Sequence, residues 1–221
     1  MSFRDIARRW LVANALAIVA TAACGWIGFG LQTLAGLESG EAGFAARAAS
    51  AASNAAVFVV RFAAFAVLTG PVLRLVVPAL SQRSWLTAHL VIGVTYAVAA
   101  ILPLFGGRDE AGSGAWRDSY PGFVIPLVLL AAAFGAVVGL ITAAVQVVVL
   151  RTVATGTRMW RLMSAASGSL EFLTILAVAW FFLSGQPVMD EIVIESASAL
   201  AGLVTAVVML PALRRLKPRE G

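Results

Sequence analysis

Two ionisable residues, Arg61 and Glu171, stand inside long apolar segments. An unpaired charge at the centre of a membrane helix costs about 2.5–3.5 kcal/mol on insertion scales. Arg61 precedes Arg74 by 13 residues, and Glu171 follows Trp160 by 11 residues. If both segments are helices that start from one boundary, these spacings place the charges at heights of about 20 Å and 16 Å. We therefore expect Arg61 and Glu171 to pair inside a helical bundle, directly or through water.

Two interpretations of this pair remain open. In the first, the pair lines a polar cavity that binds an ion or a polar solute, or relays protons. In the second, it is a structural ion pair that holds two helices in position. Glu195 is a competing partner for Arg61, although it lies nearer the opposite boundary of its segment. Asp190 and Glu191 precede it, and we interpret this acidic cluster as a solvated rim.

Small and polar residues also share a helix face. One face of the segment 122–150 carries, at spacings of four, three and four, Gly135, Gly139, Thr142 and Gln146. Small residues let membrane helices approach closely, so Gly135-x-x-x-Gly139 is interpreted as a packing motif. A lipid-facing amide would be unsatisfied, so Gln146 should point inward. The candidate residues for a ligand site or a structural polar seam are Arg61, Glu171, Gln146 and Glu195.

Catalytic, cofactor and metal chemistry have little support in the sequence. His89 is the single histidine and Cys24 the single cysteine, so paired axial haem ligands, a multi-histidine metal site and an intrachain disulfide are excluded. His89 lies one helical turn after Trp85, and we interpret it as an interfacial residue. No serine stands in a nucleophile elbow. We expect neither an enzyme, nor a cofactor, nor a bound metal.

The composition indicates that lipid is the main solvent. Of 221 residues, 61% are hydrophobic and 12% charged, against about 25% charged in soluble domains. The first apolar run continues past Cys24 to Leu37, which favours a retained span over a cleaved signal. We predict an all-α bundle in one transmembrane domain, residues 1–221. Its six spans lie near residues 10–32, 54–77, 85–105, 122–150, 164–184 and 192–213.

Basic residues cluster at alternate ends of the predicted spans. Twelve lie on the side of the two termini: Arg4, Arg8, Arg9, Arg74, Arg83, Arg151, Arg158, Arg161, Arg214, Arg215, Lys217 and Arg219. Three lie on the other side: Arg47, Arg108 and Arg117. The positive-inside rule then predicts an even number of spans with both termini in the cytoplasm. It also accounts for the net charge of +5 without nucleic acid as a partner.

The predicted spans carry a recurring pattern. Each outgoing span begins with arginine closely followed by tryptophan: Arg9-Trp10, Arg83-Ser84-Trp85 and Arg158-Met159-Trp160. Each returning span ends in leucine and arginine: Leu73-Arg74, Leu150-Arg151 and Leu213-Arg214. Residues 139–151 also align without gaps to residues 202–214. We predict three helical hairpins in parallel repeat, although interfacial tryptophan and arginine recur in many multi-span proteins.

A longer pattern runs through the second half of the chain. It consists of Gly135-x-x-x-Gly139, Gln146-x-x-x-Leu150-Arg151, Trp160 and Gly168. This pattern resembles that of uncharacterised bacterial multi-span inner-membrane proteins. The resemblance implies a bacterial inner-membrane location and no particular activity.

These observations favour two function classes. The first is a small-solute permease, or a substrate-capture subunit, that uses the buried polar seam. The second is a non-transporting membrane scaffold or accessory subunit, held by small-residue packing and internal ion pairs. We expect the lipid bilayer as a partner, and the small-residue faces would serve a partner subunit or a second copy equally well.

Overall fold

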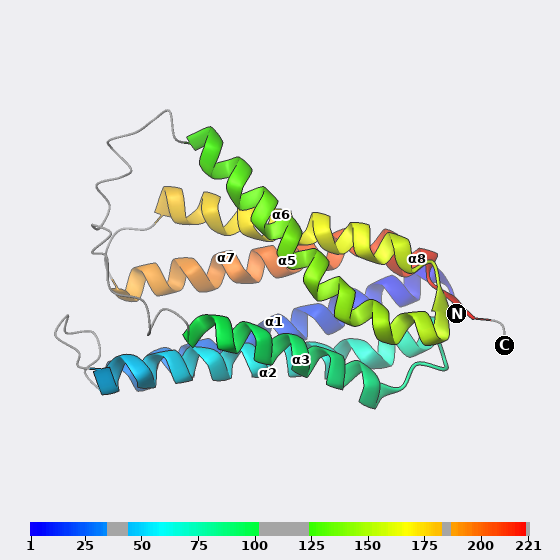
Figure 1. The fold of residues 1–221 in the computed structure, drawn as a ribbon, viewed down its shortest axis with the longest axis horizontal. Coiled ribbons are helices and arrows are strands. Elements are labelled where there is room, and N and C mark those ends of the chain that lie inside the picture. The colour runs from blue at the N-terminus through cyan, green and yellow to red at the C-terminus, as the bar shows by residue number, and fades with distance from the viewer. Residues whose placement is uncertain (35–43, 102–123, 183–186, 220–221) are drawn as a thin grey trace.

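Long helices account for almost all of the computed structural model, which describes residues 1–34, 44–101, 124–182 and 187–219 (Figure 1). Within these ranges the six long helices are α1 (Phe3–Leu34), α2 (Phe44–Val76), α3 (Gln82–Ile101), α5 (Val124–Val153), α6 (Thr157–Phe182) and α7 (Pro187–Val208). The predicted all-α class is confirmed. Most helices begin several residues before the predicted spans, because the polar first turns continue the same helix.

Five helical stretches of the described chain are long and apolar enough to cross a membrane. They are Phe3–Ile27, Ala51–Val76, Ile125–Val153, Thr157–Val178 and Ser196–Arg215. Large aliphatic side chains cover their outer faces, with Ile125 72% exposed. Helix α3 is not among the five, and its first turn carries Gln82 and Arg83. The predicted span 85–105 also continues beyond Ile101, outside the described residues. Six spans therefore stay a prediction.

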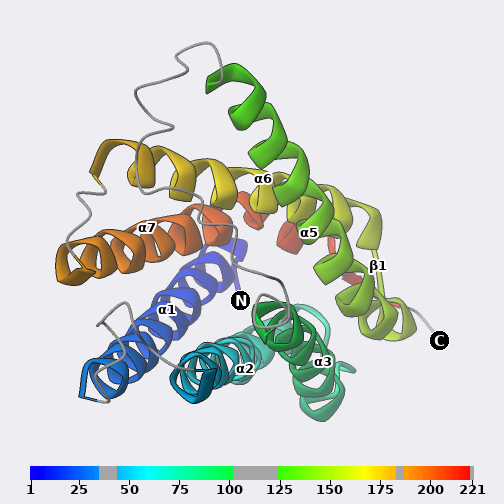
Figure 2. The same cartoon turned by 60° about the vertical axis from the view of Figure 1, so that its left-hand side comes forward.

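The helices follow one another around the bundle in chain order, and α1 packs against α7 to close the ring (Figure 2). Helices α1, α2 and α3 form one tightly packed group, and α5, α6 and α7 form another. The predicted hairpin of α3 and α5 is the loosest neighbouring pair, and α5 diverges from α3 toward its N-terminal end. The packing thus groups the helices by threes, whereas the sequence predicted pairs.

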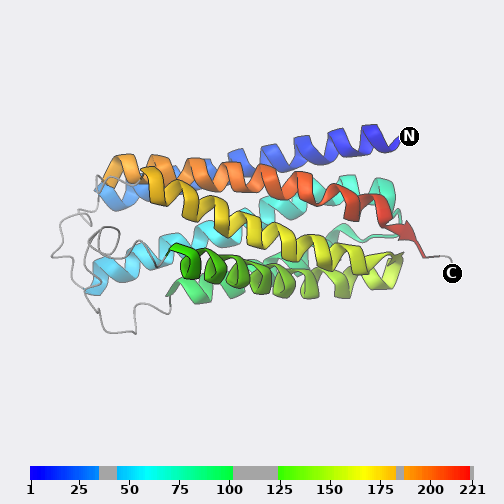
Figure 3. The ribbon, with the colours of Figure 1, turned by 90° about the horizontal axis from the view of Figure 1, so that it is seen from above.

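Both termini lie at the same end of the bundle, which we call the basic end (Figures 1 and 3). The short strand β1 (Ala154–Thr155) pairs there with β2 (Lys217–Pro218) in an antiparallel ladder. Gly156 follows β1 with a φ of +81°, a conformation that side chains with a Cβ rarely adopt. This small sheet, absent from the prediction, ties the C-terminal tail to the turn between α5 and α6.

The predicted segment 192–213 is interrupted. Helix α7 ends at Val208, and α8 (Leu210–Arg215) continues after Met209. Pro211 explains the break, because its ring lacks an N–H and clashes with the carbonyl four residues earlier.

The hydrophobic core is concentrated at the basic end. Its largest fully buried side chains include the tryptophans and leucines of the repeat pattern: Trp10, Trp85, Trp160, Leu73, Leu150 and Leu213. Toward the other end the described residues of α5 before Gly135 include none that is buried. The bundle is therefore densely packed at the basic end and more open at the opposite end.

Glycines bring α5 and α6 into backbone contact. A Cβ on Gly135 would overlap the backbone of Gly168, and a Cβ on Gly139 would overlap the Ser164 carbonyl. The Phe134 and Phe172 rings meet edge to face beside this contact, 5.1 Å between centroids. The geometry agrees with the predicted packing role of Gly135-x-x-x-Gly139.

We expect Gly139→Val to lower the free energy of unfolding by about 1–3 kcal/mol, because the valine side chain has no space against α6. Thermal unfolding of the purified protein in detergent would measure the loss. Ala133→Val is the matched control, since Ala133 is exposed on the same helix. Equal melting temperatures for the two variants would contradict the packing role.

Candidate functional site

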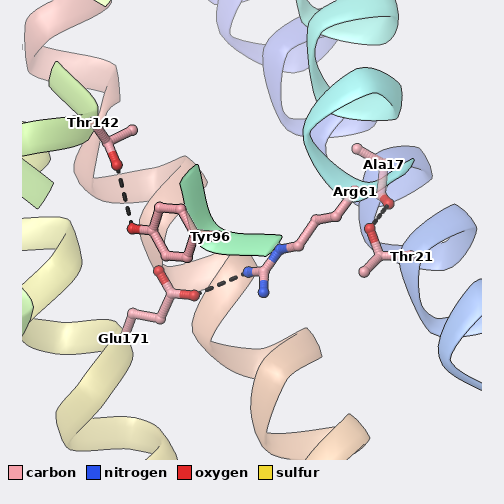
Figure 4. Close-up of polar contacts among 6 residues, drawn as sticks. All are labelled: Ala17, Thr21, Arg61, Tyr96, Thr142 and Glu171. Carbon is pink, nitrogen blue, oxygen red and sulfur yellow. Dashed lines mark hydrogen bonds and ion pairs between the residues drawn. The ribbon is translucent and has the colours of Figure 1, made fainter. Parts of the chain in front are cut away.

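Arg61 and Glu171 meet across the interior of the bundle (Figure 4). The Arg61 Nη2 atom on α2 donates a hydrogen bond to Glu171 Oε1 on α6 at 2.9 Å. The two helices belong to opposite groups of three, so the pair joins those groups. The side chains keep 32% and 26% of their surface exposed, which leaves both charges accessible. The backbone of Glu195 lies in α7, but its side chain is outside what the structure describes.

Other polar side chains lie at the height of this pair. The Tyr96 hydroxyl on α3 is 3.4 Å from Thr142 Oγ1 on α5, and its ring lies beside Glu171 in Figure 4. Thr21 on α1 donates to the Ala17 carbonyl at 2.8 Å. We call Arg61, Glu171, Tyr96, Thr142 and Thr21 the upper polar layer. It brings a cation, an anion, a phenol and two aliphatic hydroxyls together from five helices.

Gln146 is the centre of a second polar group, nearer the basic end. Its Oε1 accepts a hydrogen bond from Trp160 Nε1 at 2.8 Å, and its Nε2 lies 3.0 Å from His89 Nε2. His89 Nδ1 lies 2.9 Å from the Trp85 carbonyl oxygen, which only accepts, so Nδ1 carries the proton. His89 Nε2 then accepts from the Gln146 amide. Each of these side-chain nitrogen and oxygen atoms therefore has a hydrogen-bond partner while the imidazole is neutral.

This group confirms one prediction and corrects another. Gln146 points inward and is 6% exposed, as the cost of a lipid-facing amide predicted. The interfacial assignment of His89 is wrong, because its side chain has no exposed surface. Periodicity alone gave the height of His89 along its helix but not the direction of its side chain.

The three repeat-pattern tryptophans meet inside the bundle. The ring centroid of Trp160 is 6.1 Å from that of Trp10 and 6.1 Å from that of Trp85, both with edge-to-face geometry. Trp10 Nε1 donates to the Ala206 carbonyl at 3.0 Å, and Trp85 Nε1 lies 3.3 Å from Thr69 Oγ1. We call Trp10, Trp85 and Trp160 the tryptophan layer. These side chains are core residues and not part of an interfacial belt.

The polar residues recur at fixed distances from the tryptophans. Four residues after each tryptophan stand Asn14, His89 and Ser164, all buried. Eleven residues after each stand Thr21, Tyr96 and Glu171. Four residues before each leucine–arginine pair stand Thr69, Gln146 and Met209. These spacings can be read from the sequence, and they relate the polar positions of the three hairpins to one another.

The hydrogen bonds follow the same order. Trp85 and Trp160 each contact the polar side chain on the preceding returning helix, Thr69 and Gln146 respectively. On the last returning segment the corresponding position, four residues before the leucine–arginine pair, is Met209. Trp10 donates instead to the Ala206 backbone carbonyl of α7. Each outgoing helix is therefore joined by an indole N–H to the returning helix before it around the ring, which for α1 is α7.

Two hydroxyls inside the bundle have no hydrogen-bond partner among the described residues. They are Ser167 Oγ on α6 and Thr205 Oγ1 on α7. Buried polar groups are normally satisfied, so such atoms call for a water molecule or a ligand. Within the described ranges no three histidine, cysteine or acidic side chains lie close enough to hold a metal ion. The arrangement is therefore suited to hydrogen bonding and charge recognition.

Comparison with known proteins identifies no relative: no family model, curated protein or solved structure matches the chain.

We expect Gln146→Leu to lower the free energy of unfolding by about 1–3 kcal/mol, because it leaves the buried Trp160 N–H without an acceptor. Trp160→Phe removes the donor. In the double variant the loss in free energy of unfolding should differ from the sum of the two single losses by a coupling energy of about 0.5–3 kcal/mol. Chemical unfolding in mixed micelles measures the cycle. Additive losses would show that the bond contributes nothing.

Proposed function

We propose that this protein is an integral membrane protein that binds a small polar solute at Arg61 and Glu171, as a permease or a substrate-capture subunit. The observation that carries the proposal is this partly exposed ion pair, which lies in the interior of a bundle with an aliphatic outer surface. A charge in such surroundings is costly unless it has a partner or a function.

The groups around the pair support solute binding over a purely structural role. Arg61 and Glu171 retain about a third and a quarter of their side-chain surface, so a solute can contact both charged groups. The Tyr96 and Thr142 hydroxyls add donors and acceptors of neutral type. A cation and an anion side by side suit a solute that carries both an acidic and a basic group, or several hydrogen-bonding groups.

The uneven packing of the bundle supports access from one side. The tryptophan layer and the leucines beside it fill the basic end, and the upper polar layer lies beyond them toward the more open end. A solute would reach the pair from that open end. For a permease, alternating access requires that the three tryptophans of the layer move apart so that the solute can pass to the basic end. For a substrate-capture subunit, a partner subunit would drive that movement.

The basic end supports a cytoplasmic position for both termini in a bacterial inner membrane. The five apolar stretches together with α3 would give six crossings. An even number of crossings places both termini on the same side, in agreement with their position at one end of the bundle. Helix α3 then crosses with its polar first turn among the headgroups, where Arg83 is stable. The recurring tryptophan-to-acceptor bonds support an origin of the three hairpins by duplication.

A non-transporting scaffold is the second candidate. The observation that favours it is the direct 2.9 Å contact, since a pair already satisfied within the protein needs no ligand. A scaffold would use the exposed aliphatic faces for its partners.

The double variant Arg61→Leu/Glu171→Leu separates the two candidates. Replacing both charges together is often neutral for stability, so the fold should survive. For a solute-binding protein, mass spectrometry of protein purified in native lipid should detect a polar small molecule. Its amount should fall about tenfold or more in the double variant, because charge-assisted hydrogen bonds contribute roughly 1.5–3 kcal/mol each.

Arg74→Leu is the control, because Arg74 is an exposed arginine at the end of the same helix. It should retain the wild-type amount of the small molecule. A wild-type protein that carries no small molecule, with the same co-purifying subunits in all variants, would support the scaffold.

Reporter fusions test the membrane placement. Alkaline phosphatase, active only outside the cytoplasm, should be inactive when fused after Thr155 or after Gly221, and active when fused within residues 106–121. A C-terminal fusion of green fluorescent protein should fluoresce. Phosphatase activity at only one of the first two positions would mean an odd number of crossings between them and would exclude six spans.

A further inference from the structure

A groove lies on the outside of the bundle between α3 and α5, near the basic end. Its volume is about 460 Å³, within the range of roughly 300–1,000 Å³ that is usual for ligand sites. Arg83, Ser84 and Thr87 line it on α3, and Val145, Val148 and Val149 line it on α5. None of its lining residues belongs to the upper polar layer, so the solute site does not account for the groove.

The loose packing of α3 on α5 explains the groove. Behind it, the hydrogen bond between His89 and Gln146 holds the two helices together. Farther from the basic end, the contact between Tyr96 and Thr142 does the same. Apart from Arg83, the side chains that line the groove are small or β-branched, and they do not fill the space. The two hydrogen bonds therefore close the inner side of the groove, and its outer side stays open.

The polar rim of the groove has a single free charge. Within the described residues the Arg83 guanidinium has no ion-pair partner. The Thr87 hydroxyl is already committed to the Arg83 carbonyl at 3.0 Å. Asp5 is the one acidic residue of the described chain at the basic end, and it bonds Ser2. The rim therefore favours a negatively charged group that comes from outside the protein.

We propose that this groove binds an anionic phospholipid from the leaflet at the basic end. The lipid phosphate lies against the Arg83 guanidinium, and one acyl chain lies along Val145, Val148 and Val149. The valine surface continues into the aliphatic exterior of α5, which suits a lipid chain better than a soluble anion. The cluster of arginines at this end raises the local concentration of anionic headgroups. The proposal requires the membrane placement above but not the solute site.

Native mass spectrometry of the full-length protein in detergent tests the site, with phosphatidylglycerol and phosphatidylcholine of identical chains as probes. We expect phosphatidylglycerol to form a one-to-one complex more readily. Arg83→Ala should weaken this complex about fivefold, the contribution of one arginine near an anionic surface. Val148→Trp should weaken it as much by filling the groove, while soluble glycerol phosphate should not displace the lipid.

Two matched variants serve as controls. Arg158→Ala removes another exposed arginine from the basic end, and Val137→Trp adds a tryptophan three turns away on the same face of α5. Both should bind phosphatidylglycerol as the wild type does. Equal binding of the two lipids, or an unchanged complex in Arg83→Ala or in Val148→Trp, would overturn the proposal. Displacement by glycerol phosphate would also overturn it.

Discussion

Polar groups among apolar helices must find their partners within the protein, because hydrocarbon offers none. In this chain several buried polar side chains of the described residues meet that requirement through another helix, and others bond a carbonyl of their own helix. Gln146 serves Trp160 and His89 at once, and Arg61 reaches Glu171 across the bundle. These bonds help to fix the relative positions of α2, α3, α5 and α6, together with the glycine contacts between α5 and α6.

The two polar groups differ in what surrounds them. The group around Gln146 lies among tryptophans, is fully satisfied and includes a neutral histidine, so it serves as a structural joint. The upper polar layer holds two full charges with exposed surface, and free hydroxyls of Ser167 and Thr205 occur elsewhere in the interior. The satisfied polar group therefore lies toward the basic end, and the partly exposed charges lie farther from it. A binding protein that must keep one side closed needs this separation.

Much of this architecture could be predicted from the sequence, because helix rise converts spacing into height. Counting from Arg74 and Trp160 put Arg61 and Glu171 at similar depth, and the structure brings them together. Direction around the helix axis was harder to predict. His89 and the tryptophans have both an apolar body and a polar atom, so an interfacial position suited them as well as a buried one. The loose packing of α3 on α5 depends on how the facing side chains of the two helices fit together. Residue spacing within one helix does not predict that fit.

The contact between α1 and α7 joins the first helix to the last. Trp10 donates to a carbonyl 196 residues later in the chain. During synthesis α1 therefore emerges from the ribosome long before Ala206 is made. The Trp10 indole cannot form this hydrogen bond until nearly the whole polypeptide has been synthesised. The ring of helices can close only after the C-terminal residues have left the ribosome. In any product truncated before Ala206, α1 therefore lacks this hydrogen bond.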